Sequence, residues 1–386
     1  MDKRSIIGYI LIGLVLVFYF YYNQPSEEQI QAQKELAAAQ RREELRKDSI
    51  SMAEETQKIA MAKDQSSFFY NVLRGENKNV AIQNEKIKAE ISTYGGRIAS
   101  VTIKDYAGQD GNPLVLFDSK DKIKVTDSNK ELNGSNTINF FFKSNLADRN
   151  INTNELFFVP VNATDSTVTM RLNFEEGNRY MDFNYSLKGN SYMMDLEIVA
   201  HNMNDIIAND EVGITWKQFL RQLEPGYDFE QRFSSLTYKL AGDDSDYLNE
   251  MTDDSEKLKE DISWVAYKNQ FFSSIMIAGD KFSNVDINSE TIQKDKGLLK
   301  RCTTKMQTAF DPTGKEPTAL QFYFGPNKFD ILKESNALVS GSNEDPELQE
   351  IIYFGWPVVR WINRYFVMPL FDILSGFGLN MGIVLI

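Results

Sequence analysis

Cysteine and histidine are almost absent from this chain of 386 residues, since Cys302 and His201 are the single examples. One thiol cannot form an internal disulfide or build a cysteine-rich zinc site. One imidazole likewise excludes catalysis by a histidine pair and metal binding by a histidine cluster within the chain. We therefore expect no catalytic, cofactor-binding or metal-binding residues, and we interpret His201 as an ordinary strand residue.

Basic residues are also fewer than acidic ones, 42 against 55, which gives a formal net charge of −13. Such a balance repels a phosphate backbone, so we expect no nucleic acid partner. Aromatic residues, by contrast, make up 12% of the chain, with 26 Phe and 17 Tyr. This content favours a well-packed sheet protein over intrinsic disorder.

Charge is missing altogether from Ile6 to Tyr22, a run of 17 residues that follows Lys3 and Arg4. A helix of this length spans roughly 25 Å, enough for a bilayer core when its terminal aromatic rings reach the interface. We predict an uncleaved membrane anchor over residues 1–23, because the bulky rings after Phe18 offer no small-residue cleavage site. A cleaved signal peptide is the alternative. The charges of Lys3 and Arg4 place the N-terminus in the cytoplasm, so that the following chain is translocated.

Glycine and proline are missing from Ser26 to Gln65, where Glu, Gln, Ala, Lys and Arg dominate. This composition favours helix and disfavours a compact core, so residues 24–76 are predicted to form a charged helical spacer. The apolar residues Leu36, Leu45 and Ile59 are too widely spaced for a sustained heptad seam. A coiled-coil pairing site is the alternative to a solvated spacer.

Short runs of alternating apolar and polar residues fill the chain from about Asn77 to Phe324. Alternation indicates half-buried strands, and Gly177 and Gly189 mark turns between successive runs. Residues 77–338 are therefore predicted to form one antiparallel, mainly β domain, a sandwich because so many strands need two packed sheets. The clearest apolar positions are Val168, Met170, Leu172 and Phe174, then Met181, Phe183, Tyr185 and Leu187, then Met194, Leu196, Ile198 and Ala200, and finally Leu320, Phe322 and Phe324.

The acidic segment from Asp243 to Asp261 departs from this pattern and is predicted to be a solvated loop. Calcium binding is the alternative, but the segment lacks the glycine and the ligand spacing of a calcium loop. A short helix is predicted from Lys328 to Leu338, followed by a turn at Ser340 to Asn343.

Large apolar and aromatic residues return between Trp356 and Leu374, together with two arginines one helical turn apart. This pattern predicts an amphipathic helix in the membrane interface within residues 347–375. A buried core helix is the alternative, since an apolar face serves either purpose. The apolar run from Met381 predicts that residues 376–386 begin a second transmembrane helix. The predicted membrane-interface residues are Arg360, Trp361, Ile362, Arg364, Tyr365 and Phe366.

Four short strings, at this order and spacing, resemble the N-terminal part of the YidC family of bacterial membrane protein insertases. The strings are Tyr94-Gly95-Gly96-Arg97-Ile98, Trp264-Val265-Ala266-Tyr267-Lys268-Asn269-Gln270-Phe271-Phe272, Tyr323-Phe324-Gly325-Pro326 and Tyr353-Phe354-Gly355-Trp356. With the anchor and the amphipathic helix, the resemblance covers essentially all 386 residues.

The resemblance implies that the β domain is a β-supersandwich of the galactose-mutarotase type, facing the periplasm from the bacterial inner membrane. It implies a protein that inserts and helps fold membrane proteins, alone or with the Sec translocon. The implied partners are nascent membrane proteins, the translocon with its accessory subunits, and the lipid bilayer. The family's insertion groove and its basic side chain belong to a bundle of transmembrane helices beyond Ile386, so no groove residue is assigned here.

Two other hypotheses remain open from the residues. One is a membrane-tethered sugar-binding or aldose-epimerase-like domain, because the first string also resembles a strand motif of those enzymes. Epimerisation there uses paired histidines, and this chain has His201 only. The other is an envelope scaffold protein, which would leave the segment from Trp356 to Ile386 without a role.

Overall fold

The structure is a computed structural model that describes residues 12–14, 41–42, 46, 52–120, 123–127, 130–146, 149–294, 296–341, 345–352 and 367. The chain divides into two units, Met1–Ser67 and Phe68–Ile386. In the first unit, residues 52–63 are helical, as the spacer composition predicts. None of the helices formed by the described residues has both the length and the apolar character to cross a bilayer. The predicted anchor is described only at residues 12–14, so Lys3 and Arg4 fall outside the described residues.

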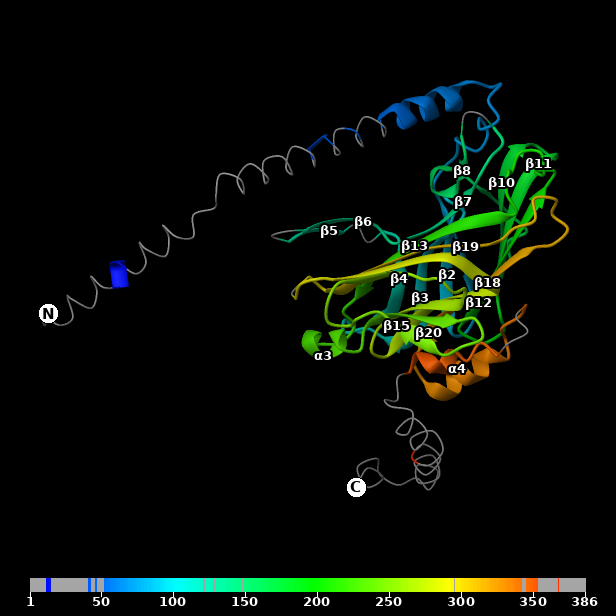
Figure 1. Cartoon of the computed structure of the whole chain (residues 1–386). Helices are drawn as coiled ribbons and strands as arrows, with labels where there is room; N and C mark the ends of the chain where they lie inside the picture. Colours follow the sequence, from blue (N-terminus) through cyan, green and yellow to red (C-terminus); the bar gives the residue numbers. More distant parts are fainter. Residues whose placement is uncertain are drawn as a thin grey trace, which may run out of the picture. The chain divides into compact units, whose positions relative to one another are not determined.

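Antiparallel strands build the second unit, as the alternation predicts (Figure 1). A smaller sheet contains, in spatial order, β1 (Asn79–Gln83), β2 (Ile87–Ser92), β3 (Ile98–Ala107) and β4 (Pro113–Asp118). The larger sheet runs through β8 (Ile151–Asn152), β7 (Thr137–Phe142), β13 (Glu211–Arg221), β19 (Leu298–Ala309), β18 (Phe272–Thr291), β20 (Thr318–Pro326), β12 (Met193–His201), β11 (Arg179–Leu187), β10 (Thr167–Glu175) and β9 (Val159–Val161). Joined to this path are β14 (Ser235–Leu240), β15 (Ser245–Tyr247), β16 (Asp254–Lys257) and β17 (Ile262–Lys268). A separate hairpin pairs β5 (Ile123–Asp127) with β6 (Lys130–Gly134), and η1 (Thr153–Glu155), α3 (Tyr227–Gln231), α4 (Phe329–Asn336) and η2 (Leu348–Ile351) are the described helices of this unit.

Strand β18 links the two halves of the larger sheet because it is 20 residues long. Its first half pairs with β17 and β20, and its second half pairs with β16 and β19. The register shifts between Ser283 and Asp286, and Asn284 between them has a φ of 50°. A bulge of this kind bends and twists a strand, which lets one strand serve both halves.

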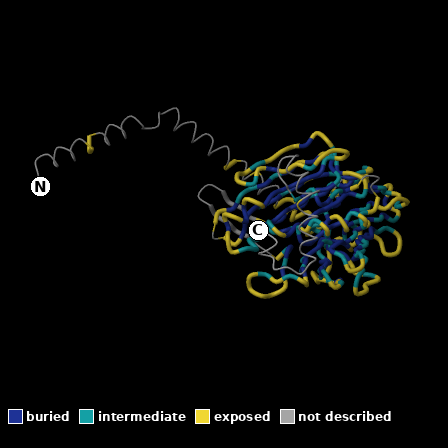
Figure 2. The backbone as a smooth tube through the Cα atoms, turned by 90° about the horizontal axis from the view of Figure 1, so that it is seen from below, coloured by how far each residue is buried: buried dark blue, intermediate teal, exposed yellow. Residues whose placement is uncertain are grey.

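The core is lined by the alternating positions that the sequence marks. In β10 the residues Val168, Met170 and Leu172 are buried while their neighbours are half-buried, and β11 and β12 continue the pattern. Gly177 and Gly189 lie between these strands with φ values of 70° and 46°, which confirms the predicted turns. Figure 2 shows the buried stretches concentrated inside the domain, with exposed segments around its periphery.

The acidic segment from Asp243 to Asp261 is not all loop, which corrects the prediction from its composition. Two short strands form within it, β15 beside β14 and β16 beside β18. The long strand β18 offers unpaired backbone groups that β16 can satisfy, even though the side chains of β16 remain largely exposed. Leu248 and Leu258 anchor the segment because both are buried.

The helix predicted from Lys328 to Leu338 is confirmed as α4, and the following described residues return to the β domain. Residues 345–352 lie within or beside the predicted interfacial region, yet they pack on β14 and β17. The indole nitrogen of Trp264 donates to the carbonyl of Pro346 at 2.7 Å, and Leu348 and Ile351 are buried. The amine of Lys239 contacts the carboxylates of Glu347 at 2.7 Å and Glu350 at 3.0 Å.

Candidate binding groove

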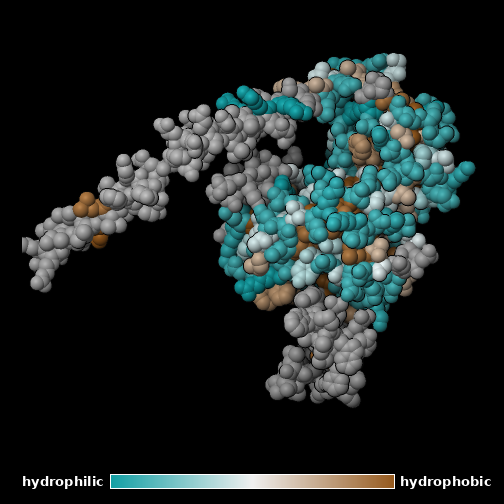
Figure 3. All heavy atoms as spheres, in the orientation of Figure 1, coloured by the Kyte–Doolittle hydropathy of each residue, from teal (hydrophilic) through white to brown (hydrophobic). Residues whose placement is uncertain are grey.

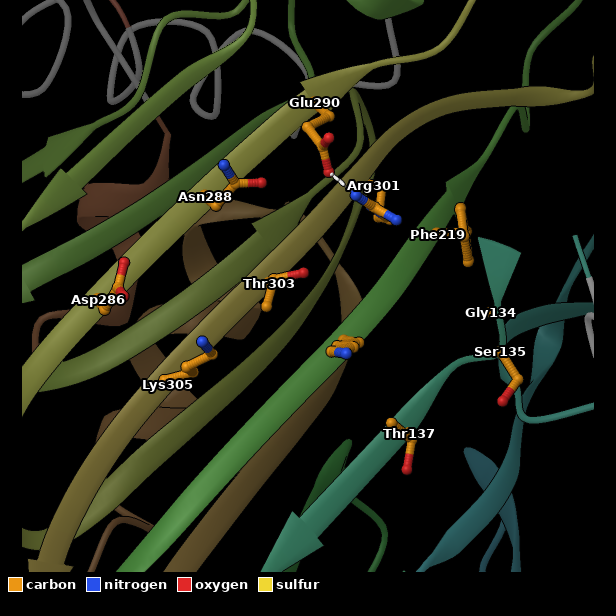
Figure 4. A pocket seen from close by; sticks show the side chains of 11 residues that line it. Gly134, Ser135, Thr137, Phe219, Asp286, Asn288, Glu290, Arg301, Thr303 and Lys305 are labelled. Atoms are coloured by element: carbon orange, nitrogen blue, oxygen red, sulfur yellow. Dashed lines mark hydrogen bonds and ion pairs between the residues drawn. The ribbon is translucent and has the colours of Figure 1, made fainter. Parts of the chain in front are cut away.

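A polar groove lies on the face of β13, β19 and β18 that turns away from the core, with a volume of about 560 Å³. Each strand contributes alternate residues to it, because side chains two apart along a strand share one face. The lining residues are Gly134, Ser135, Thr137, Lys217, Phe219, Asp286, Asn288, Glu290, Arg301, Thr303 and Lys305 (Figure 4).

The strand register aligns these side chains into cross-strand rows. Glu290 is paired with Arg301, and Arg301 is paired with Phe219 on the next strand. The following rows join Asn288 with Thr303, and Asp286 with Lys305. Opposite charges therefore stand directly across from each other, which stabilises antiparallel pairs.

The row of Glu290 and Arg301 is held by a direct ion pair. The Nε of Arg301 donates to a carboxylate oxygen of Glu290 at 2.5 Å, and Figure 4 shows the two side chains pointing toward each other. Asp286 and Lys305 lie further along the same groove without a hydrogen bond or ion pair to one another in the described part of the chain. The groove thus presents both signs of charge to a ligand.

The opposite face of the same strands is core. Trp216 stacks on Tyr267 with ring centroids 3.9 Å apart, and the Tyr267 hydroxyl donates to the Trp216 carbonyl at 2.9 Å. Cys302 is fully buried there, and burial raises the pKa of its thiol to about 12. A thiol that stays protonated is a poor nucleophile, so Cys302 acts as a small core residue.

His201 lies at the end of β12 and is not among the residues that line the groove. Its ring stacks on Tyr180 with centroids 4.2 Å apart, and its Nε2 lies 3.7 Å from a carboxylate oxygen of Asp182. The groove therefore offers amide, hydroxyl and charged groups without an imidazole. Such a set suits hydrogen bonding and ion pairing with a polar ligand.

The six predicted membrane-interface residues, Arg360, Trp361, Ile362, Arg364, Tyr365 and Phe366, lie outside the described residues. Their role stays a prediction. The groove was not predicted, because its rows depend on the register between strands that are far apart in the sequence. The one local signal is the polar alternation of Arg301, Thr303 and Lys305 along β19.

Residues 79–369 match the family model described as the YidC periplasmic domain. The chain belongs to the YidC family. A relative named membrane protein insertase YidC, from Phocaeicola vulgatus, is 42% identical over 392 aligned residues. That alignment covers 100% of this chain and 60% of the relative, so the chain spans less than two thirds of that family member.

Solved structures similar to this YidC-family chain include a galactose mutarotase related enzyme from Lactobacillus acidophilus. It is 11% identical with a TM-score of 0.39, and the match covers 64% of this chain and 97% of that one. A YidC structure from Thermotoga maritima is 12% identical with a TM-score of 0.33, covering 81% of this chain and 66% of that one.

Proposed function

We propose that this chain is the N-terminal portion of a membrane protein insertase, which assists the insertion, folding and assembly of inner-membrane proteins. The observation that supports this proposal is the similarity, over the whole of this chain, to a relative named membrane protein insertase YidC. The proposed partners are nascent membrane proteins, the lipid bilayer, and the Sec translocon with its accessory subunits.

The proposed location is the bacterial inner membrane, with the N-terminus in the cytoplasm and the β domain in the periplasm. Residues 1–23 would anchor the chain, residues 24–76 would act as a spacer, and residues 376–386 would begin the second membrane helix. Lys3 and Arg4 support this orientation through the positive-inside rule.

The β domain is suited to docking or positioning more than to insertion itself. Moving a charged group into the hydrocarbon core costs about 2.5–3.5 kcal/mol on insertion scales, and a protein lowers that cost with a wet path between membrane helices. A sheet with a closed apolar core offers no such path. The mixed charges of the groove fit a docking role, because charge complementarity steers and orients a partner.

A chimera tests the insertase proposal. The matching N-terminal part of the Phocaeicola vulgatus relative would be replaced by this chain, and the chimera would be produced in cells depleted of their own insertase. We expect it to restore insertion of a single-span reporter, measured by protease accessibility, whereas the relative with its N-terminal part reduced to the anchor provides the control. Failure of the chimera while it accumulates to the level of the intact relative would overturn the proposal.

The proposed orientation is tested by a phosphatase fused after Val339, an enzyme that is active only in the periplasm. We expect activity from the native sequence and a clear loss from the Lys3→Glu, Arg4→Glu double variant, because positive charge retains the N-terminus in the cytoplasm. Equal activity from both fusions would contradict the assigned role of these two charges.

We propose that the chain is not an enzyme, and in particular not a sugar epimerase, because it offers one histidine where that chemistry uses a pair. The measurement is mutarotation of an aldose by the purified chain, with His201→Ala as the comparison. Turnover above background that disappears in the variant would contradict the proposal.

A further inference from the structure

Exposed apolar residues gather at one place on the β domain. Among the described residues of this domain, seven large hydrophobic side chains are exposed, and four of them line a single pocket of about 430 Å³. We call these four the aromatic rim: Phe229, Phe233, Tyr247 and Phe271. Figure 3 shows apolar side chains at the lower left of the molecule, over α3, the helix that contains Phe229.

Ring contacts and backbone hydrogen bonds hold the aromatic rim in place. Phe229 lies in α3 and Phe233 lies in the turn that follows it, with ring centroids 5.1 Å apart. Phe271 lies in the turn between β17 and β18, and its carbonyl accepts a hydrogen bond from the Asn327 amide at 2.7 Å. Because the backbone under such an exposed ring is already fixed, less conformational entropy is lost when the ring binds a partner, which favours a role in binding.

One buried carboxylate joins the two segments that carry the rim. Glu230 of α3 accepts hydrogen bonds from the backbone amides of Leu223 and Glu224, both at 3.0 Å. It also accepts one from the side chain of Asn269 at 3.2 Å, and Asn269 begins the turn that contains Phe271. The spacing between α3 and this turn is therefore fixed by direct bonds.

The same pocket is lined by two basic side chains, Lys268 and Arg232. Lys268 is only 8% exposed and lines the pocket, and in the described part of the chain its amine makes no hydrogen bond or ion pair. Burial lowers the pKa of Lys268 and raises the pKa of Glu250, the carboxylate that also lines the pocket, and the attraction between these two charges opposes both shifts. Arg232 is exposed beside them. A buried amine that no carboxylate contacts directly favours an additional anionic ligand.

Chain continuity indicates what that ligand is. Ile352 lines the pocket, and four residues later Trp356 starts the segment predicted to lie in the membrane interface. Four residues reach at most about 14 Å, so the pocket must lie within that distance of Trp356. Aromatic rings with nearby Lys and Arg are the side chains that proteins place at the headgroup level, where phosphates accept their hydrogen bonds.

We propose that this pocket rests on the bilayer surface, with the aromatic rim at the acyl boundary and Lys268 and Arg232 against lipid phosphates. The proposal rests on the predicted membrane-interface placement of Trp356 to Leu374 and on the inner-membrane location given under the proposed function. It gives the acidic β domain one local point of contact with lipid. A protein partner that covers the pocket is the main competing outcome.

Spin labels on the full chain test the proposal in lipid discs of phosphatidylethanolamine and phosphatidylglycerol. Single nitroxides would replace Phe229 and Phe271 in a Cys302→Ala background, and the measured quantity is the ratio of oxygen to nickel-chelate collision rates. We expect this ratio to shift to lipid-exposed values. Phe141 and Val159 are matched controls, since both are exposed apolar residues on other strands, β7 and β9, and they should keep aqueous values.

A label at Ile362 separates the two proposals. If Ile362 reports lipid while Phe229 and Phe271 match the aqueous controls, the lipid contact of the pocket is overturned and the proposed placement of the helix stands. If Ile362 is aqueous as well, both fail. Low accessibility to both reagents at Phe229 and Phe271 would show a protein partner in place of lipid.

The phosphate contact has its own test. The Arg232→Gln, Lys268→Gln double variant should shift the Phe271 label toward aqueous values, because lipid phosphates would lose both donors. Lys143→Gln is the matched control, since Lys143 is an exposed cation beside β7. Circular dichroism of each variant checks that the fold is retained. An unchanged signal in a folded double variant would overturn the phosphate contact.

Discussion

Gly96 occupies a position that leaves no room for a side chain. Its φ is 59°, and an added Cβ would lie 2.6 Å from the ring of Phe158. Its carbonyl also accepts a hydrogen bond from the buried hydroxyl of Tyr185 at 2.8 Å. Gly96, the second glycine of the string Tyr94–Ile98, is therefore required by its backbone conformation and by the close approach of the Phe158 ring.

Replacing Gly96 by alanine should lower the free energy of unfolding by about 2–5 kcal/mol, because strain at positive φ and overpacking act together. Urea unfolding of the β domain measures this loss. Gly177→Ala is the matched control: its φ is 70° with open space around it, so it should lose only about 1–2 kcal/mol. Equal losses in the two variants would show that contact with Phe158 is unimportant.

Asp311 is the residue that most clearly makes the stability of the fold depend on pH. Its carboxylate accepts hydrogen bonds from the backbone amides of Glu316 at 3.0 Å, Thr313 at 2.8 Å and Lys315 at 2.9 Å. It accepts a further hydrogen bond from the Thr313 hydroxyl. These bonds lower its pKa to about 2. Since the folded pKa is below the unfolded value of about 3.9, this stabilisation is present above pH 4 and is lost as the pH falls toward 2.

Asp311→Asn should therefore flatten part of the decline in stability between about pH 4 and pH 2, while it lowers stability at neutral pH. Carboxyl NMR titration of the native protein provides the direct measurement, with a midpoint expected near 2. A midpoint near 4 would contradict the assignment of these hydrogen bonds.

At the scale of elements, η2 is docked on β14 through one buried cation. The side chain of Lys239 is 8% exposed, and it contacts Glu350, which is 14% exposed, as well as Glu347. Burial alone would lower the pKa of Lys239, but the two carboxylates raise it. Lys239 therefore remains charged at neutral pH, and on the alkaline side its contribution to stability is lost as the pH rises through its raised pKa.

Lys239→Met should destabilise the domain by about 3 kcal/mol, because it leaves two carboxylates without their counterion in a partly buried site. Lys281→Met is the control. Lys281 pairs with Asp261 at 2.6 Å but is 52% exposed, so its loss should cost less than about 1 kcal/mol. Thermal unfolding of the two variants at neutral pH provides the comparison. Similar losses of stability would indicate that the contacts of Lys239 with Glu347 and Glu350 do not hold η2 in place.

Strands with one solvated face were predictable from the sequence, whereas the second buried face of β17 and of β20 was not. The alternation in β10, β11 and β12 gives their positions directly. In β17, six of seven residues are buried, so no period-two pattern exists to find. In β20 the predicted inner residues are buried, but so are Gln321 and Tyr323 between them, because neighbouring elements cover both faces.

The candidate sites were hidden for related reasons. Glu290 and Arg301 are eleven residues apart, and only the register of β18 with β19 brings them together. Phe229 and Phe271 are exposed, although aromatic residues in a sequence are expected to lie in a core. Both sites depend on tertiary arrangement, which composition and periodicity do not encode.

At the scale of the whole molecule, the folded unit extends beyond the predicted limits of residues 77–338. The side chain of Asn71 donates to the carbonyl of Phe174 at 3.0 Å, and Phe68 stacks on the same residue with centroids 4.7 Å apart. Near the C-terminal limit, the indole nitrogen of Trp264 donates a hydrogen bond to the carbonyl of Pro346. These contacts place residues 68–76 and 345–352 against the sheet.

A fragment of residues 68–352 should unfold in one transition and at a higher temperature than a fragment of residues 77–338. The shorter fragment lacks the buried residues Phe69, Val72, Leu348 and Ile351 and exposes the surfaces that they cover, and each fully buried side chain of this kind contributes about 1.5–3 kcal/mol. Circular dichroism followed on heating compares the two. Two separate transitions in the longer fragment would show that the halves fold independently.

The long strand β18 also constrains how the sequence can change in length. It begins next to Phe271 in the aromatic rim and ends with Asp286, Asn288 and Glu290 in the groove. Because strand faces alternate with every residue, a single insertion upstream of the bulge at Asn284 would exchange inward and outward positions up to the next irregularity. Substitutions along this strand affect one position each, whereas a gain or loss of one residue would reverse a whole face. Related sequences should therefore vary in length in the loops and keep the number of residues between the rim and the groove constant.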